Sequence, residues 1–255
     1  MILLINLYIV ILITEIKLLT KPKTLGVIIA FTIILSWGIH LFYLLTSVQV
    51  NFYDPLFYFH ILLQAYLFTG LFITAHDAMH GNIAKDKAFN KAIGAVSCFL
   101  FAGFSYKRLL KNHYRHHNEP TSEDDPDFST HSQNFFKWWF RFIAGYTTVS
   151  QIIIMAVIYN LLKFLSDEPA VIFFWLIPVI LSTLQLFYFG TYLPHRYPER
   201  NLNSPHFARS QKKNHLIAML SCYFFGYHLE HHSSPKTPWW KLYKLYGTFR
   251  TDIQS

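Results

Sequence analysis

Long apolar runs separated by short polar turns dominate the sequence. Four of them are long enough to cross a bilayer, which takes about 20 apolar residues in a helix. They cover residues 25–48, 56–76, 138–165 and 170–193. Two further runs, 92–106 and 216–227, are too short to cross and are expected to lie along the membrane interface. The pattern predicts an all-α integral membrane protein with about four transmembrane helices and short interfacial helices.

The apolar stretch at residues 1–20 fits two placements. Its run from 2 to 14 is followed closely by Glu15, so it is shorter than a span needs. It either crosses the membrane or lies in the interface. No basic stretch precedes it and no small-residue cleavage pattern follows it, so we do not expect removal as a signal peptide. With no internal repeat, residues 1–255 are expected to form a single membrane-embedded domain.

Histidines gather in three clusters beside these runs. Within each cluster they are spaced one helical turn apart, so their imidazoles lie on one face of a helix. The members are His76 and His80; His113, His116 and His117; and His228, His231 and His232. Neutral imidazoles presented in this way can bind a metal ion from one side. The three clusters therefore indicate a metal-dependent enzyme.

The number of histidines favours two metal ions. Eight clustered imidazoles suffice for two ions with open positions, whereas a structural zinc site uses four ligands and commonly thiolates. His195, at the end of the fourth run, is a ninth candidate ligand. Iron is the expected metal, because imidazole suits iron and an open non-haem iron site binds dioxygen. His40 and His60 lie inside predicted spans and are expected to face neighbouring helices instead.

Carboxylates near the clusters are candidates to orient the imidazoles. A ligating histidine usually donates its second N–H to an outer acceptor. The candidates are Asp77, Asp124, Asp125, Asp127 and Glu230. Asp124 and Asp125 are preferred, with a solvated turn at residues 123–126 as the alternative interpretation.

Composition and charge set the location and the sidedness. Apolar residues make up 53% of the chain and charged residues 14%, far from the balance of soluble proteins. Of 22 lysines and arginines, Lys163 alone lies in a loop assigned to the outer side. Because basic loops stay on the cytoplasmic side, all three clusters are predicted to face the cytoplasm, as in a bacterial inner membrane. This bias explains the net charge of +8 without a nucleic-acid partner.

The histidine clusters carry a family resemblance. Residues 76–81 (HDAMHG), 113–117 (HYRHH) and 228–232 (HLEHH) resemble the three histidine boxes of the membrane fatty-acid desaturase and hydroxylase superfamily. Within it, residues 191–196 (TYLPHR), the DPDF motif that begins at Asp125, and FFGYHLEHH followed by SP and PWW resemble the bacterial-type β-carotene ketolases. One departure is Thr191, where many desaturases carry an asparagine; its hydroxyl would hold a water near the metal.

The resemblance implies a fold, a reaction and partners. The fold would be mushroom-shaped, with four spans carrying a cytoplasmic cap. A di-iron centre would use dioxygen and an external electron donor to oxidise C4 of a β-ionone ring to a ketone, taking β-carotene from the bilayer to echinenone and then canthaxanthin. A carotenoid hydroxylase, a fatty acyl desaturase or hydroxylase, and a non-catalytic membrane metal carrier are the alternatives.

The reaction needs electrons from outside the chain, because the sequence contains no flavin, haem or iron–sulfur motif. Basic residues around the clusters favour a small acidic carrier such as a ferredoxin. The alternative is that these charges serve only topology and membrane lipid headgroups. They are Lys107, Arg108, Lys111, Arg209, Lys212, Lys213, Lys236, Lys241 and Lys244.

Overall fold

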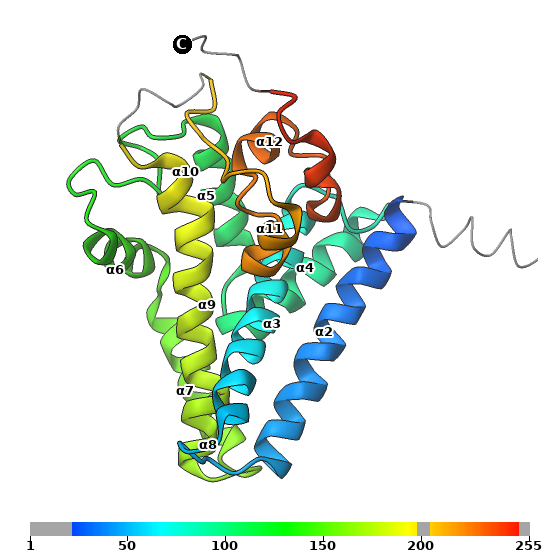
Figure 1. The fold of residues 1–255 in the computed structure, drawn as a ribbon, viewed down its shortest axis with the longest axis vertical. Helices are drawn as coiled ribbons and strands as arrows, with labels where there is room; N and C mark the ends of the chain where they lie inside the picture. The colour runs from blue at the N-terminus through cyan, green and yellow to red at the C-terminus, as the bar shows by residue number, and fades with distance from the viewer. Residues whose placement is uncertain (1–21, 198–204, 250–255) are drawn as a thin grey trace, which may run out of the picture.

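A computed structural model describes residues 22–197 and 205–249, and its regular elements are helices (Figure 1). The apolar stretch at residues 1–20 lies outside the described residues. The predicted all-α class is therefore confirmed.

Three helices are long and apolar enough to cross a membrane. They are α2 (Pro22–Ser47), α3 (Pro55–Met79) and a continuous helix, Glu168–His195. The last consists of α8 (Glu168–Val171), η1 (Ile172–Leu176), α9 (Ile177–Phe187), η2 (Tyr188–Tyr192) and α10 (Leu193–His195), where η1 and η2 are π-helical turns. These helices contain the expected spans 56–76 and 170–193 and all but the last residue of the expected span 25–48, and they make the chain an integral membrane protein.

Two capped turns start two of these helices. Asp54 accepts a hydrogen bond from the Leu56 backbone N–H at 2.9 Å, with Pro55 in the first helical position, where its missing N–H costs nothing. Asp167 accepts one from the Ala170 N–H at 3.0 Å. Both turns lie at the end of the bundle opposite α10 and α12 (Figure 1). The end that contains α10 and α12 is called the cap below.

The expected third span, 138–165, is not one straight helix. It forms α6 (Phe135–Tyr146) and α7 (Val149–Leu162), which meet at 92°. The break occurs because the Thr148 hydroxyl accepts a hydrogen bond from the Gln151 N–H at 3.1 Å and starts a new helix. Hydropathy counts apolar residues and does not register such a cap.

The two short runs form helices that flank the bundle. The first lies mainly in α4 (Lys87–Ala102), which bends by 99° into α5 (Tyr106–Asn118). The second forms most of α11 (His215–Cys222) and the turn that leads to α12 (His228–Ser233), followed by a 3-10 helix, η4 (Trp239–Leu245).

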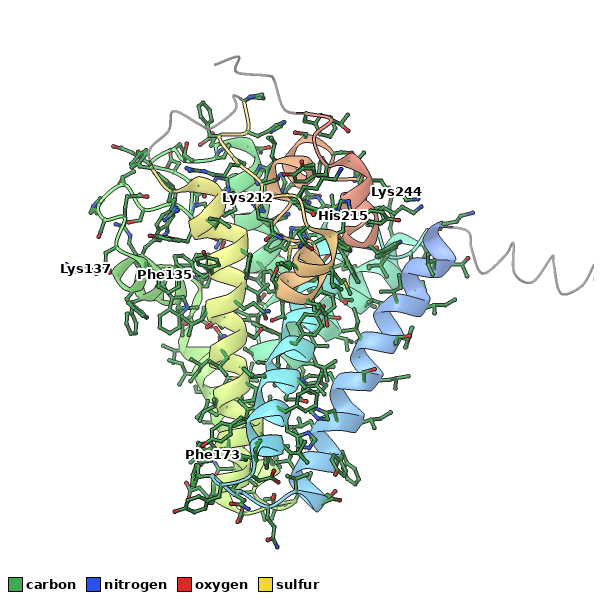
Figure 2. All side chains as sticks on the ribbon, in the orientation of Figure 1. Phe135, Lys137, Phe173, Lys212, His215 and Lys244 are labelled. Atoms are coloured by element: carbon green, nitrogen blue, oxygen red, sulfur yellow. The ribbon has the colours of Figure 1, made fainter. Side chains whose placement is uncertain are left out.

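Buried and exposed apolar side chains fit a membrane setting. Phe68 and Leu71 of α3 and Phe174 of η1 are fully buried and join one core cluster. Ile39 of α2 and Ile152 of α7 are exposed, 68% and 57%, on surfaces that lipid would cover. Figure 2 shows Lys212 and Lys244 at the cap end and Phe173 near the opposite end.

Candidate metal centre

All nine predicted histidines converge in two groups at the cap end of the bundle. In each group the candidate ligand nitrogens lie within 4.8 Å of one another. The five-histidine group is His76, His80, His113, His117 and His231. The four-histidine group is His116, His195, His228 and His232. The structure thus brings together residues as far apart in the chain as 76 and 232.

Two helices serve both groups. On α5, His113 and His117 point to the five-histidine group, whereas His116, between them, points to the four-histidine group. On α12 only His231 joins the five-histidine group, whereas His228 and His232 join the four-histidine group. The two groups are therefore neighbours, and the rings of His117 and His232 stack across them at 4.2 Å.

The Nε2 atoms face one another within each group. They are 2.6 Å apart in His80 and His113, 3.0 Å in His117 and His231, and 3.1 Å in His116 and His232. At most one proton can lie between two such nitrogens.

Two further nitrogens test whether a metal fits. Nε2 of His76 and Nε2 of His195 are buried with no hydrogen-bond partner among the described residues. A buried polar atom without a partner costs about 1–3 kcal/mol. A metal ion in each group would supply the missing partner, so the donor set fits two ions held mainly by imidazoles.

Burial keeps most of these imidazoles neutral. Desolvation, followed by the neighbouring imidazoles, lowers the pKa values of His117, His231 and His232 well below the ordinary value. Burial and then the Lys236 ammonium lower the pKa of His80 to about 3. Since only a neutral imidazole can donate a lone pair to a metal, these four imidazoles are held in their ligand form.

His116 has a carboxylate partner. Its Nδ1–H donates to both oxygens of Asp125, each at 3.0 Å, and Asp125 is only 4% exposed. The backbone N–H groups of Thr121 and Asp127 also donate to Asp125, at 2.9 and 2.8 Å. Burial lowers the pKa of His116, but the Asp125 and Asp127 carboxylates outweigh it and raise that pKa to about 9. This contact fixes the proton on Nδ1 and aims Nε2 at the four-histidine group.

Asp124 points the other way from Asp125. Its side chain is 80% exposed and lies 3.7 Å from the Arg115 guanidinium. The expectation that Asp124 orients a histidine is therefore corrected, because this carboxylate faces solvent and pairs with an arginine.

Two more of these carboxylates, Asp77 and Glu230, anchor the cap. Asp77 lies 4.0 Å from Nδ1 of His76 and accepts a hydrogen bond from the Trp239 N–H at 3.1 Å. Glu230 is fully buried, but its described partners are the Ser210 hydroxyl and the Gly247 N–H rather than an imidazole. Glu230 thus ties α12 to two cap segments, which differs from the predicted role as an orienter of histidine.

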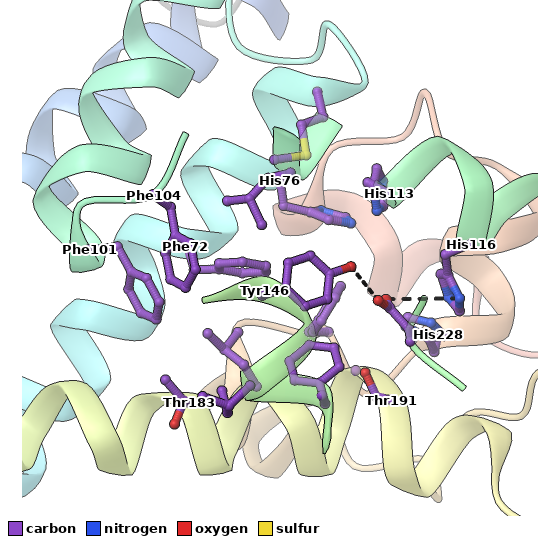
Figure 3. Close-up of a pocket in the computed structure, with 18 residues that line it drawn as sticks. Phe72, His76, Phe101, Phe104, His113, His116, Tyr146, Thr183, Thr191 and His228 are labelled. Atoms are coloured by element: carbon purple, nitrogen blue, oxygen red, sulfur yellow. Dashed lines mark hydrogen bonds and ion pairs between the residues drawn. The ribbon is translucent and has the colours of Figure 1, made fainter. Parts of the chain in front are cut away.

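An apolar cavity of about 70 Å³ opens onto both groups. Its lining includes His76 and His113 of the five-histidine group and His116 and His228 of the four-histidine group. Figure 3 shows Phe72, Phe101 and Phe104 at the opposite end, with Tyr146 between them and the histidines. Thr191, which is buried, also lines this cavity.

Comparison with known proteins places the chain. Its sequence matches the fatty acid desaturase family over residues 53–169 and 148–254. The chain belongs to this family. It is 39% identical to a beta-carotene ketolase from a Paracoccus species over 180 residues, which is 69% of this chain and 74% of the relative. No solved structure gives a significant match.

Two other relatives of this desaturase-family protein are longer than this chain. A zeaxanthin 4-ketolase from Chlamydomonas reinhardtii is 41% identical over 187 residues, 70% of this chain and 41% of the relative. A beta-carotene 4-ketolase from Protosiphon botryoides is 32% identical over 256 residues, 87% of this chain and 63% of the relative.

Three contacts at this desaturase-family site were missed by sequence reasoning. His195 donates from Nδ1 to the Phe207 carbonyl at 2.9 Å, and no side-chain pattern marks a backbone acceptor. The Tyr146 hydroxyl donates to Asp127, which lies 3.9 Å from Nδ1 of His116. The Phe225 ring lies 4.9 Å from that of His76 and 5.2 Å from that of His228, so it touches both groups.

The two intramembrane histidines behave as expected. His40 on α2 donates from Nδ1 to the Gln64 side chain on α3 at 2.6 Å, and its Nε2 lies 3.2 Å from Nδ1 of His60. They join two helices and lie outside both histidine groups.

Proposed function

We propose that this protein is a β-carotene ketolase. It would oxidise C4 of a β-ionone ring to a ketone, converting β-carotene to echinenone and then canthaxanthin, with dioxygen and electrons from an external donor. The observation that carries the proposal is the apolar cavity that ends on histidines of both groups. The names of the Paracoccus and Protosiphon relatives support the same substrate.

The metal in this proposal is iron, one ion in each histidine group. Imidazole-bound iron with an open position supplies dioxygen activation, whereas zinc has no redox chemistry. The histidines would hold the ions, Asp125 would fix the His116 ring, and the aromatic walls would exclude water from the reacting carbon.

The substrate in this proposal is a bilayer-dissolved polyene with a cyclic end. Apart from the histidines and Asp127, aromatic and aliphatic side chains form most of the cavity wall, which suits a hydrocarbon ring. A metal carrier would need ligands along a path through the spans, but these histidines share one end of the bundle.

The electron donor in this proposal is an acidic carrier that docks on the cap from the cytoplasm. Lys212 and Lys213 are exposed there, and Lys236 donates from Nζ to the His80 carbonyl at 2.8 Å. A positive surface beside the site would attract an acidic protein over a long range.

Expression in cells that make β-carotene tests the reaction. The native chain is expected to yield echinenone and canthaxanthin, whereas His116→Ala and His231→Ala, one from each group, should yield neither while still inserting in the membrane. A hydroxylated carotenoid or a changed fatty acyl profile without any ketone would overturn the proposal in favour of another reaction of the family.

A further inference from the structure

Two sharp helix bends meet beside the cavity. The α4–α5 bend is 99° and the α6–α7 bend is 92°. The Gln151 amide donates to the Ala102 carbonyl at 2.9 Å, and the Arg108 guanidinium donates to the Gly145 carbonyl at 2.9 Å. Each hydrogen bond runs from one bent pair to the other, so the two corners form one junction.

Gly103 lets the corners approach closely. Its φ is +66°, in the left-handed region that favours glycine. A Cβ there would lie 2.8 Å from Cγ2 of Ile154 on α7, closer than real contacts allow. Both the turn and the close contact therefore require glycine at this position.

A second, smaller cavity of about 10 Å³ lies inside the junction. Its lining is Phe104, Ser105, Arg108, Leu109, Tyr146, Thr148 and Gln151. Three of these side chains, Phe104, Leu109 and Tyr146, also line the main cavity. The two spaces are therefore separated by a wall one side chain thick.

The outer side of the junction is accessible. Ser105 and Arg108 are exposed, and they line the small cavity. Next to them the surface of α7 is apolar, with Val149 75% and Ile153 58% exposed. An apolar surface on a helix beside the spans faces the bilayer, so the junction is open to lipid-dissolved molecules.

We propose that this junction is the lateral entrance by which an apolar substrate leaves the bilayer and reaches the histidines. Phe104, Leu109 and Tyr146 form its gate, which is closed in this structure. The identity of the substrate rests on the proposed function; the route does not. The hydrogen bond from Tyr146 to Asp127 holds the gate beside His116, and an entering ring must displace the Tyr146 phenol from it.

Reversible blockage of the junction tests the route. In Ser105→Cys the new thiol is exposed, whereas the native Cys98 and Cys222 are buried and protected. After reaction with a bulky thiol-specific reagent that forms a disulfide, this variant should bind liposomal β-carotene more slowly, and its kcat/KM should fall by about tenfold or more. Quenching of tryptophan fluorescence measures the rate of association. A reductant should restore both. Iron content and oxygen uptake without carotenoid should stay unchanged.

Thr46→Cys, exposed at the far end of α2, is the matched control, and its modification should change neither rate. Unchanged association and turnover in modified Ser105→Cys would overturn the entrance. The entrance would also be overturned if Thr183→Trp, at another part of the main cavity wall, blocked β-carotene association while modification of Ser105→Cys did not. If the unmodified protein binds β-carotene but forms no ketone, the proposed function fails, and the association rates still decide the route.

Discussion

Replacing Asp125 by asparagine should weaken iron binding through one hydrogen bond. Three donors converge on this carboxylate: Nδ1–H of His116 and the backbone N–H groups of Thr121 and Asp127. In Asp125→Asn the side chain keeps its size but offers one oxygen and one NH₂ group. At least one donor then faces another donor and loses its partner.

The size of the effect follows from two independent ranges. A hydrogen bond to a charged group contributes about 1.5–3 kcal/mol. Loss of an outer partner of a ligating histidine typically lowers metal affinity about 10–100-fold. Since tenfold corresponds to about 1.4 kcal/mol, the ranges agree, and we expect Asp125→Asn to lower iron affinity by about one to two orders of magnitude.

Iron retention against a chelator measures this prediction. Purified protein is dialysed against a series of chelator concentrations, and iron per chain is determined. Asp124→Asn is the matched control, because Asp124 is exposed, pairs only with Arg115 among the described residues, and should change retention by less than about 0.5 kcal/mol. Equal retention in Asp125→Asn and the native protein, or equal loss in the two variants, would refute the orienting role of Asp125.

Two further changes probe the cavity and the cap. Gly190→Ala places a Cβ into the Phe225 ring and should reduce turnover markedly, whereas Gly38→Ala, with open space around its Cβ, should leave turnover unchanged. Equal turnover of the two variants in product assays would contradict a role of the Phe225 position in the reaction. Reversing Lys212 and Lys213 to glutamate should slow donor-dependent turnover and flatten its salt dependence without changing iron content; stopped-flow reduction at several ionic strengths checks this, and unchanged rates would leave these lysines a topological role.

Local spacing predicted which histidines matter, because positions one helical turn apart share a helix face whatever the tertiary fold. The allocation between groups could not be predicted in this way. His113, His116 and His117 lie on one turn of α5, yet His116 faces a different group. That division depends on tertiary packing, which brings the His113 ring within 4.6 Å of that of His76 on α3 and the His116 ring within 4.8 Å of that of His195 on α10.

Adjacent residues and helix breaks set similar limits. Asp124 and Asp125 are neighbours of the same type, but a turn sends one to solvent and the other to His116. Apolar content predicted a span at 138–165, whereas the Thr148 cap bends that stretch by 92°. A threonine cap carries no hydropathy signal, so the junction that we propose as the entrance could be recognised only in three dimensions.

Titration of metal-free protein with iron tests the central claim most directly, because it joins the two histidine groups to the reaction. β-Carotene and an electron-donor system are supplied, and the ketone formed is measured against iron bound per chain. The account predicts that ketone formation rises with iron, saturates at about two ions per chain, as expected for one per group, and is not supported by zinc. Ketone formation with zinc, or full activity with no bound iron, would contradict it.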